Sequence, residues 1–176
     1  MSYRAEFANS TKFLHTECMR LGVDIKTGKK ELTELIREMR PDSLVIATGS
    51  LLDRFQIPGA KLPHVYNADV AITSGVVGPN VVVVDSGEAD WRVLTTAENL
   101  ADKGHNVTLV SPISIASEID AFSRPPFMRR LAQAKINCLE NHSLISINKQ
   151  NVEFKHKWSG EKLLLAADNV VLSWFN

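Results

Sequence analysis

Hydrophobic positions in the N-terminal third of the chain follow a helix–strand–helix–strand pattern. Apolar side chains recur at helical spacing over residues 7–21, and Gly22 ends this predicted helix. Residues 23–25 predict a short strand, and residues 32–39 predict a second helix with one apolar face. The continuous apolar run at residues 44–47 is typical of a strand buried on both faces.

The second half of the chain begins with a strand–helix–strand pattern. Residues 81–84 are a second continuous apolar run, residues 89–103 have helical periodicity, and residues 106–110 predict the next strand. A connection of this kind predicts a parallel sheet with a right-handed crossover. A further helix is expected from Pro125. Short strands are then expected at residues 136–139, 144–147, 152–156 and 162–165, followed by an apolar run at 170–172.

These patterns predict an α/β fold. We expect a Rossmann-like parallel sheet with a small antiparallel hairpin, plus an incomplete N-terminal α/β lobe. The predicted domains are residues 1–78, a partial α/β lobe, and residues 79–176, a Rossmann-like domain. Pro and Gly recur between residues 57 and 79, which indicates an ordered connector between the two predicted domains.

Composition excludes several classes of partner. Twenty basic residues balance twenty acidic ones, so we expect no binding to nucleic acid or to a membrane surface. No apolar run approaches the ~20 residues of a membrane span, and the N-terminus lacks a signal-peptide pattern, which predicts a cytoplasmic protein. Cys18 and Cys138 are far apart and not in metal-ligand spacing, so no metal site is expected. Two buried, inert thiols are expected, with a disulfide between them as the alternative.

The turn after the strand at residues 81–84 is the most informative segment. A dinucleotide-binding β-α-β unit carries G-x-G-x-x-G at this position. Here the chain reads Asp85-Ser86-Gly87-Glu88-Ala89-Asp90. Only the middle glycine, Gly87, is retained, and carboxylates stand at both outer positions.

Those carboxylates change the expected chemistry of the turn. A helix N-terminus normally binds phosphate through free N–H groups and the positive end of its dipole. Asp85 and Asp90 can instead cap those N–H groups, which predicts a capped helix that binds nothing and makes NAD(P) binding unlikely here. The next strand agrees, because Ser111-Pro112 stands where an acidic ribose ligand is expected. A working NAD(P)H site that uses main-chain N–H groups around Gly87 is the alternative.

Two further motifs reveal a family resemblance. The run Ala47-Thr48-Gly49-Ser50, followed by Ile57-Pro58-Gly59, resembles the A-T-G-(S/A)…I-P-G signature of flavoproteins with two dinucleotide-binding domains. The glycine-poor turn and the A-E-x-L-A-x-x-G-H-x-V-T-x-V pattern over residues 97–110 resemble trimethylamine dehydrogenase and its relatives, including 2,4-dienoyl-CoA reductase. The resemblance covers roughly residues 12–172.

The resemblance implies a fragment of a larger flavin-dependent oxidoreductase. In that family, FMN and a [4Fe-4S] cluster are bound in an N-terminal part that this chain lacks. The resemblance also implies that residues 1–78 are a partial FAD/ADP-binding-like lobe with the ATGS motif and residues 79–176 an NAD(P)-type domain with a degenerate glycine motif. FAD or ADP is then expected close to Thr48, Gly49 and Ser50, and the rest of the parent flavoenzyme is the expected partner. Homo-oligomerisation is a further open alternative.

The remaining candidates give no active-site group. No nucleophile–base pair can be proposed from spacing, so we expect no catalytic residue and no metal ligand in this chain. Trp91 is expected to cap the core rather than to stack on adenine. The function that the resemblance implies is nucleotide binding and support of electron transfer within an amine dehydrogenase, demethylase or enoyl reductase. The alternative is a non-catalytic structural or partner-docking domain that has lost its cofactor site.

Overall fold

The computed structural model describes residues 6–28, 32–49 and 57–173. The chain divides into two compact units, residues 1–49 and 50–176. The sequence placed this boundary near residue 78. The second unit starts earlier because residues 65–67 form a strand of its parallel sheet and residues 68–74 form a helix that packs in its core. The assignment of the two segments to an FAD/ADP lobe and an NAD(P)-type domain stays a prediction.

The first unit contains two helices, α1 (Phe7–Arg20) and α2 (Leu32–Met39). Helix α1 ends where Gly22 adopts a positive φ of 72°, with the Gly22 and Val23 N–H groups donating to carbonyls of the last turn. Both helices were predicted from the apolar spacing, and both are confirmed.

The two strands predicted in this unit, residues 23–25 and 44–47, are wrong. Residues 23–27 and 43–49 have no regular secondary structure. Val45 and Ile46 are 87% and 78% exposed, so the apolar run is not buried on either face. A strand is held by a ladder to a neighbouring strand, and these segments form none with any other described residues.

The second unit is an α/β sandwich. Its elements in chain order are β1 (Val65–Asn67), α3 (Ala68–Ser74), β2 (Asn80–Asp85), α4 (Trp91–Asp102), β3 (Asn106–Val110), α5 (Arg124–Gln133), β4 (Asn137–Leu139), β5 (His142–Ile147), β6 (Asn151–His156), β7 (Lys162–Ala166) and β8 (Asn169–Ser173).

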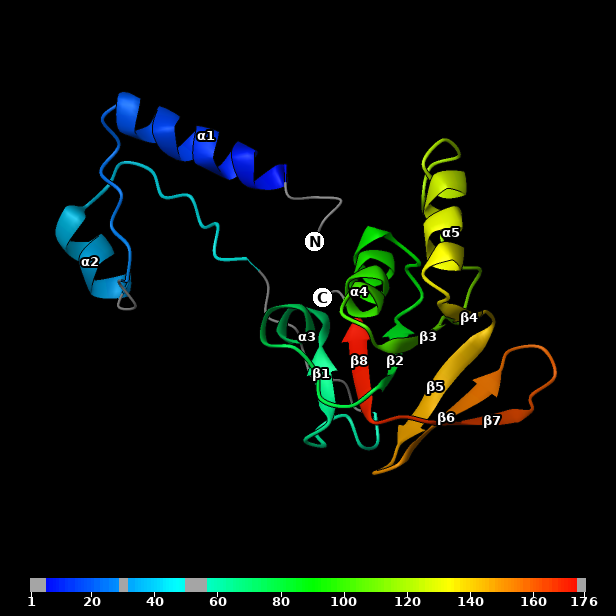
Figure 1. Cartoon of the computed structure of the whole chain (residues 1–176). Coiled ribbons are helices and arrows are strands. Elements are labelled where there is room, and N and C mark those ends of the chain that lie inside the picture. The colour runs from blue at the N-terminus through cyan, green and yellow to red at the C-terminus, as the bar shows by residue number, and fades with distance from the viewer. Residues whose placement is uncertain (1–5, 29–31, 50–56, 174–176) are drawn as a thin grey trace. The chain divides into compact units, whose positions relative to one another are not determined.

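Five of these strands form one parallel sheet in the order β1-β8-β2-β3-β4. The predicted β2-α4-β3 crossover is confirmed. Strand β8 comes from the end of the chain and lies between β1 and β2 (Figure 1). If the strands are counted along the chain from β2, then β2, β3, β4 and β8 are the first to fourth strands. Their order in the sheet, β4-β3-β2-β8, is then 3-2-1-4, as in doubly wound nucleotide-binding folds. The predicted α/β class is therefore confirmed.

The predicted antiparallel hairpin is a three-stranded antiparallel sheet, β5-β6-β7. One expected tail strand, residues 136–139, instead joins the parallel sheet as β4, paired with β3.

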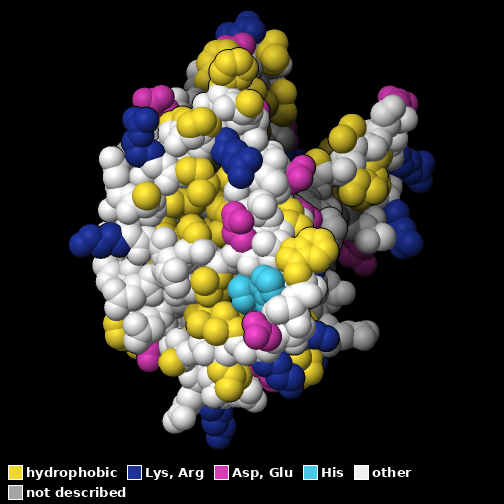
Figure 2. Space-filling view, turned by 90° about the vertical axis from the view of Figure 1, so that its right-hand side faces the viewer, with side chains coloured by type: hydrophobic (Ala, Val, Ile, Leu, Met, Phe, Trp, Pro, Cys, Tyr) yellow, Lys and Arg dark blue, Asp and Glu magenta, His cyan; other side chains and the backbone are white. Residues whose placement is uncertain are grey.

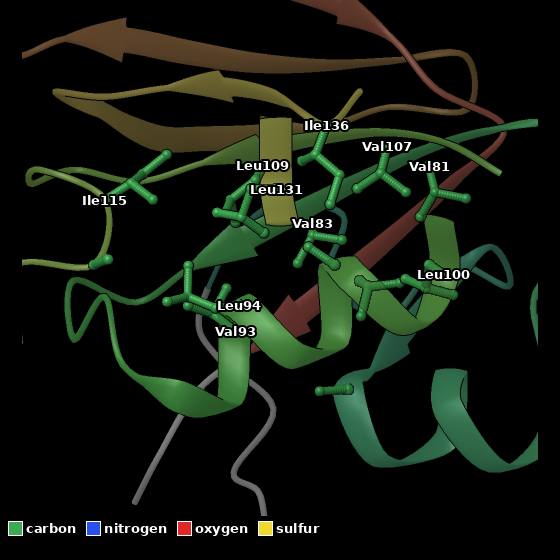
Figure 3. Close-up of a cluster of buried hydrophobic side chains, with 14 of the residues drawn as sticks. Val81, Val83, Val93, Leu94, Leu100, Val107, Leu109, Ile115, Leu131 and Ile136 are labelled. Atoms are coloured by element: carbon green, nitrogen blue, oxygen red, sulfur yellow. The ribbon is translucent and has the colours of Figure 1, made fainter. Parts of the chain in front are cut away.

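Two apolar layers hold the second unit together. On one face of the parallel sheet, Val81, Val83 and Leu109 pack against α4 and α5 (Figure 3). On the other face, Val82 and Val84 pack against the antiparallel sheet. Because β2 is covered on both faces, each of its valines is at most 2% exposed, which explains its unbroken apolar run.

Candidate nucleotide site

The crevice at the carboxyl ends of the parallel strands is where ligands bind in open α/β sheets, at the point where the strand order reverses. In this chain that point lies between β2 and β8, where Asp85 is in register with Ser173. Residues 85–90 follow β2 and lead into α4. The glycine-poor turn singled out from the sequence therefore occupies the expected place of a pyrophosphate.

Asp85 fills this place with its own carboxylate. The side chain is buried, at 3% exposure. Its oxygens accept hydrogen bonds from the N–H groups of Glu88, at 3.3 Å, and Ala89, at 3.1 Å. The Ser111 hydroxyl donates a third bond, at 2.7 Å. Ala89 has a φ of 42°, in the left-handed region that favours glycine, so the carboxylate holds a turn that the sequence does not favour locally.

Asp90 caps the helix that follows. Its side chain accepts hydrogen bonds from the N–H groups of Arg92, at 2.9 Å, and Val93, at 3.5 Å. Together the two aspartates take up four N–H groups of the turn and first helical turn. These are groups that a bound phosphate would use in a glycine-rich site. The capping role expected from the sequence is confirmed.

The charge at the turn is also unfavourable for phosphate. Partial burial, then the nearby Asp90 and Asp85 carboxylates, raise the pKa of Glu88 above its ordinary value, while Arg92 opposes this shift. A dianionic pyrophosphate would meet the same repulsion. The residues present therefore do not fit the pyrophosphate of NAD(P) at this turn.

Gly87, the retained glycine, lies at the bend of the turn with a φ of 110°. A Cβ atom at this position would be 3.3 Å from Pro112 Cγ. Glycine is thus suited here by backbone conformation and by a close neighbour, whether or not a ligand is bound.

The other predicted binding residues lie in the first unit. Thr48 and Gly49 belong to the irregular segment 43–49 and are exposed. Gly49 has a φ of 76°, and a Cβ atom there would meet nothing within 4 Å. Ser50 lies outside the described residues. Thr48 and Gly49 are close to each other only because they are consecutive in the chain, and their binding role stays a prediction.

The Ile57-Pro58-Gly59 motif has a structural role in this chain. The Pro58 carbonyl accepts a hydrogen bond from Ile147 N–H at 2.8 Å, which ties the segment to β5. A Cβ atom on Gly59 would lie 1.9 Å from the Ile147 carbonyl oxygen. The glycine permits this close approach, so the motif positions the antiparallel sheet.

Trp91, the first residue of α4, packs as predicted against the core rather than standing free. Its ring meets the buried Phe127 ring edge-on, with centroids 5.0 Å apart. Arg130 of α5 lies over the same Phe127 ring at 4.0 Å and forms an ion pair with Glu98 of α4 at 2.6 Å. These contacts join α4 to α5 next to the turn.

Sequence reasoning missed the role of Ser111. The sequence indicates only that an acidic ribose ligand is absent at this position, whereas the Ser111 hydroxyl is the third partner of Asp85. A usable signal existed, because the ends of adjacent parallel strands meet at one edge of a sheet. A serine and an aspartate at those ends are then within reach of each other.

Among the residues that the structure describes, no group of three or more His, Cys, Asp or Glu side chains is placed to hold one metal ion. Cys18 and Cys138 are half-buried free thiols. Across the same residues, none of the helices has the length and apolar character needed to cross a membrane.

Comparison with known proteins places these features in a family. The family described as pyridine nucleotide-disulphide oxidoreductase matches residues 4–174. A bilirubin reductase of Mediterraneibacter gnavus is 28% identical over 172 residues, which are 97% of this chain and 26% of that protein. An N,N-dimethylglycine/sarcosine dehydrogenase of Chromohalobacter salexigens is 28% identical over 141 residues, 76% of this chain and 20% of that protein.

A solved structure has a similar fold. The complex of 2-naphthoyl-CoA reductase with 2-naphthoyl-CoA matches with a TM-score of 0.84 and 27% identity, over 96% of this chain and 25% of that protein. The chain thus spans about a quarter or less of the length of these relatives.

Proposed function

Because the chain belongs to the pyridine nucleotide-disulphide oxidoreductase family, we propose that it is the nucleotide-fold region of a larger flavin-dependent oxidoreductase of the trimethylamine dehydrogenase and dienoyl-CoA reductase type. Two observations support this proposal. The family matches residues 4–174, and the similar reductase and dehydrogenase are about four to five times as long as the matched region. FMN and a [4Fe-4S] cluster would then be bound by other parts of the enzyme, as would the substrate.

Within this region, we assign nucleotide binding to the segment around Thr48, Gly49 and Ser50, with ADP or the ADP part of FAD as the ligand. The observation that carries this assignment is the occupied turn of the second unit. Asp85 and Asp90 accept hydrogen bonds from four N–H groups that a second nucleotide would need. The second unit then serves as scaffold, and NAD(P)H is not its ligand.

Calorimetric titration of the chain with ADP, FAD, NADH and NADPH tests this function. Micromolar binding of ADP or FAD, with none of NADH or NADPH, is the expected result. Thr48→Ala combined with Ser50→Ala should weaken it. Thr16→Ala is the matched control, because the Thr16 hydroxyl only donates to the Lys12 carbonyl of its own helix. Selective binding of NADH or NADPH would overturn the assignment.

A non-catalytic docking role is the second candidate. It is favoured by the large apolar side chains that the first unit exposes, including Phe7, Leu14 and Val45. In this case none of the four nucleotides would bind, and the segment would serve to contact the remainder of the enzyme. The same titration separates the two candidates.

A further inference from the structure

Two imidazoles lie side by side on neighbouring strands of the antiparallel sheet. His142 begins β5, His156 ends β6, and the two residues are register partners. Their ring centroids are 4.9 Å apart, with planes tilted by 56°. Both residues are half-buried. Histidine side chains form one patch on the face shown in Figure 2, next to carboxylate and hydrophobic side chains.

The separation of the rings matches that of two histidines bound to one metal ion. A Zn–N bond is ~2.0–2.1 Å, and the ring centre lies about 1.1 Å beyond the nitrogen. At the tetrahedral angle of about 109°, these lengths put the two centroids about 5 Å apart. The spacing of the two rings therefore matches that of two imidazoles on one ion.

Both rings make their hydrogen bonds through Nδ1, and neither Nε2 atom is engaged by the described residues. His142 Nδ1 lies 2.6 Å from the Glu140 carbonyl, which can only accept, so Nδ1 carries the proton and Nε2 has the lone pair. Metal-binding histidines characteristically donate the other ring N–H to a carbonyl or carboxylate in this way.

His156 is held by the turn between β6 and β7. Its Nδ1 lies 3.0 Å from Ser159 Oγ and 3.1 Å from Ser159 N. Ser159 Oγ donates its own hydrogen to Glu161 Oε2 at 3.1 Å, so Oγ can accept from Nδ1–H. In that tautomer the His156 Nε2 also presents a lone pair. The Ser159 N–H, in contrast, donates to Nδ1 in the tautomer that is protonated at Nε2, so metal binding has to displace that tautomer and break this hydrogen bond.

We propose that His142 and His156 form a two-histidine site for a divalent transition-metal ion of the imidazole-binding class, such as Zn²⁺, Ni²⁺ or Cu²⁺. The ion binds both Nε2 atoms, and water completes its coordination, because the described residues supply no third protein ligand. Bound metal links the start of β5 to the end of β6. The site is separate from the nucleotide function proposed above, and its test is independent of that proposal.

Zinc chloride titration of the full chain, followed by NMR of the histidine ring signals, tests the site. The chain has five histidines, and a Cys18→Ser, Cys138→Ser background removes thiol binding. We expect the signals of two histidines to shift together and saturate at one equivalent of Zn²⁺. His142→Gln and His156→Gln should each weaken binding at least tenfold.

The matched control is His105→Gln. His105 Nδ1 also lies near a carbonyl, that of Gly78, at 2.9 Å, but it does not face a second imidazole. Zinc affinity should be unchanged in this variant. Ser159→Ala keeps both ligands and removes the Oγ contacts with His156 and Glu161, so it should weaken binding by a smaller factor. Equal affinity in His142→Gln and the parent, or shifts of unrelated histidines, would overturn the proposal.

Discussion

The Ser111 hydroxyl donates a hydrogen bond of 2.7 Å to Asp85 Oδ2 and thereby joins the carboxyl ends of β3 and β2. In a glycine-rich nucleotide site, this edge of the sheet is open to a ligand. Here it is closed by a buried carboxylate that also holds two N–H groups of the following turn. The candidate nucleotide site of the second unit has become part of the internal hydrogen-bond network.

A double-mutant cycle measures this coupling. Asp85→Ala should lower the free energy of unfolding by about 2–4 kcal/mol, because three donors lose a charged acceptor. Ser111→Ala should cost about 1 kcal/mol, and the double variant should fall short of the sum by roughly 0.5–1.5 kcal/mol. Urea unfolding of the four proteins gives these values. Strictly additive losses would show that the bond contributes nothing of its own.

Restoring glycine should reopen the turn to a dinucleotide. Asp85→Gly with Asp90→Gly removes two carboxylates and frees four N–H groups, so affinity for NADH should rise roughly tenfold or more, given a repulsion of about 1–4 kcal/mol per close pair. Calorimetry below the melting temperature measures the gain. Asp85→Asn with Asp90→Asn keeps the bulk and removes the charge, which separates the two obstacles. An unchanged affinity in the glycine variant would refute the account of a blocked site.

The carboxylate cluster also predicts a pH dependence of stability. Burial and the neighbouring aspartates raise the pKa of Glu88 in the folded state. The folded state therefore holds this proton more tightly than the unfolded chain. The stability that Glu88 contributes is present at low pH and is lost as pH rises through its folded pKa.

Replacing Glu88 by Gln removes the ionisation that causes this loss. Glu88→Gln should therefore raise the melting temperature at pH 7, and the gain over the parent should shrink as pH is lowered toward 4. Glu118→Gln, at an exposed loop position, serves as the control and should show no such trend. A constant difference at all pH values would contradict the predicted role of charge repulsion.

The sequence predicted the β2-α4-β3 unit because its signals are local. Four consecutive valines fit a strand covered on both faces, and an aspartate at the helix start is a direct capping signal. The position of β8 between β1 and β2 could not be read in the same way. It depends on pairing between residues more than eighty positions apart, such as Val81 with Asn169.

The N-terminal unit shows why a local pattern can fail. Residues 44–47 have the composition of a buried strand, but a strand forms only when a neighbouring strand supplies its hydrogen-bond partners. Within the described part of that unit no such neighbour is present. Thr48 and Gly49 were predicted as site residues from a motif, and their binding role stays a prediction.

The Gly59 position tests whether the I-P-G motif acts through packing. Gly59 and Gly104 have nearly equal positive φ angles, 88° and 90°. A Cβ atom on Gly59 would meet the Ile147 carbonyl oxygen at 1.9 Å, whereas one on Gly104 would meet nothing within 4 Å. Gly104→Ala should therefore show only the cost of the backbone conformation, about 1–2 kcal/mol.

Gly59→Ala carries the same conformational cost and adds a clash with a backbone atom. We expect it to lower the free energy of unfolding by at least ~2 kcal/mol more than Gly104→Ala, because either the Pro58–Ile147 hydrogen bond or the packing of β5 must give way. Urea unfolding followed by tryptophan fluorescence measures both variants. Hydrogen exchange of the Ile147 amide should increase in Gly59→Ala alone. Equal losses in the two variants would mean that the motif is not needed to seat the antiparallel sheet, and a role in ligand binding would then have to explain it.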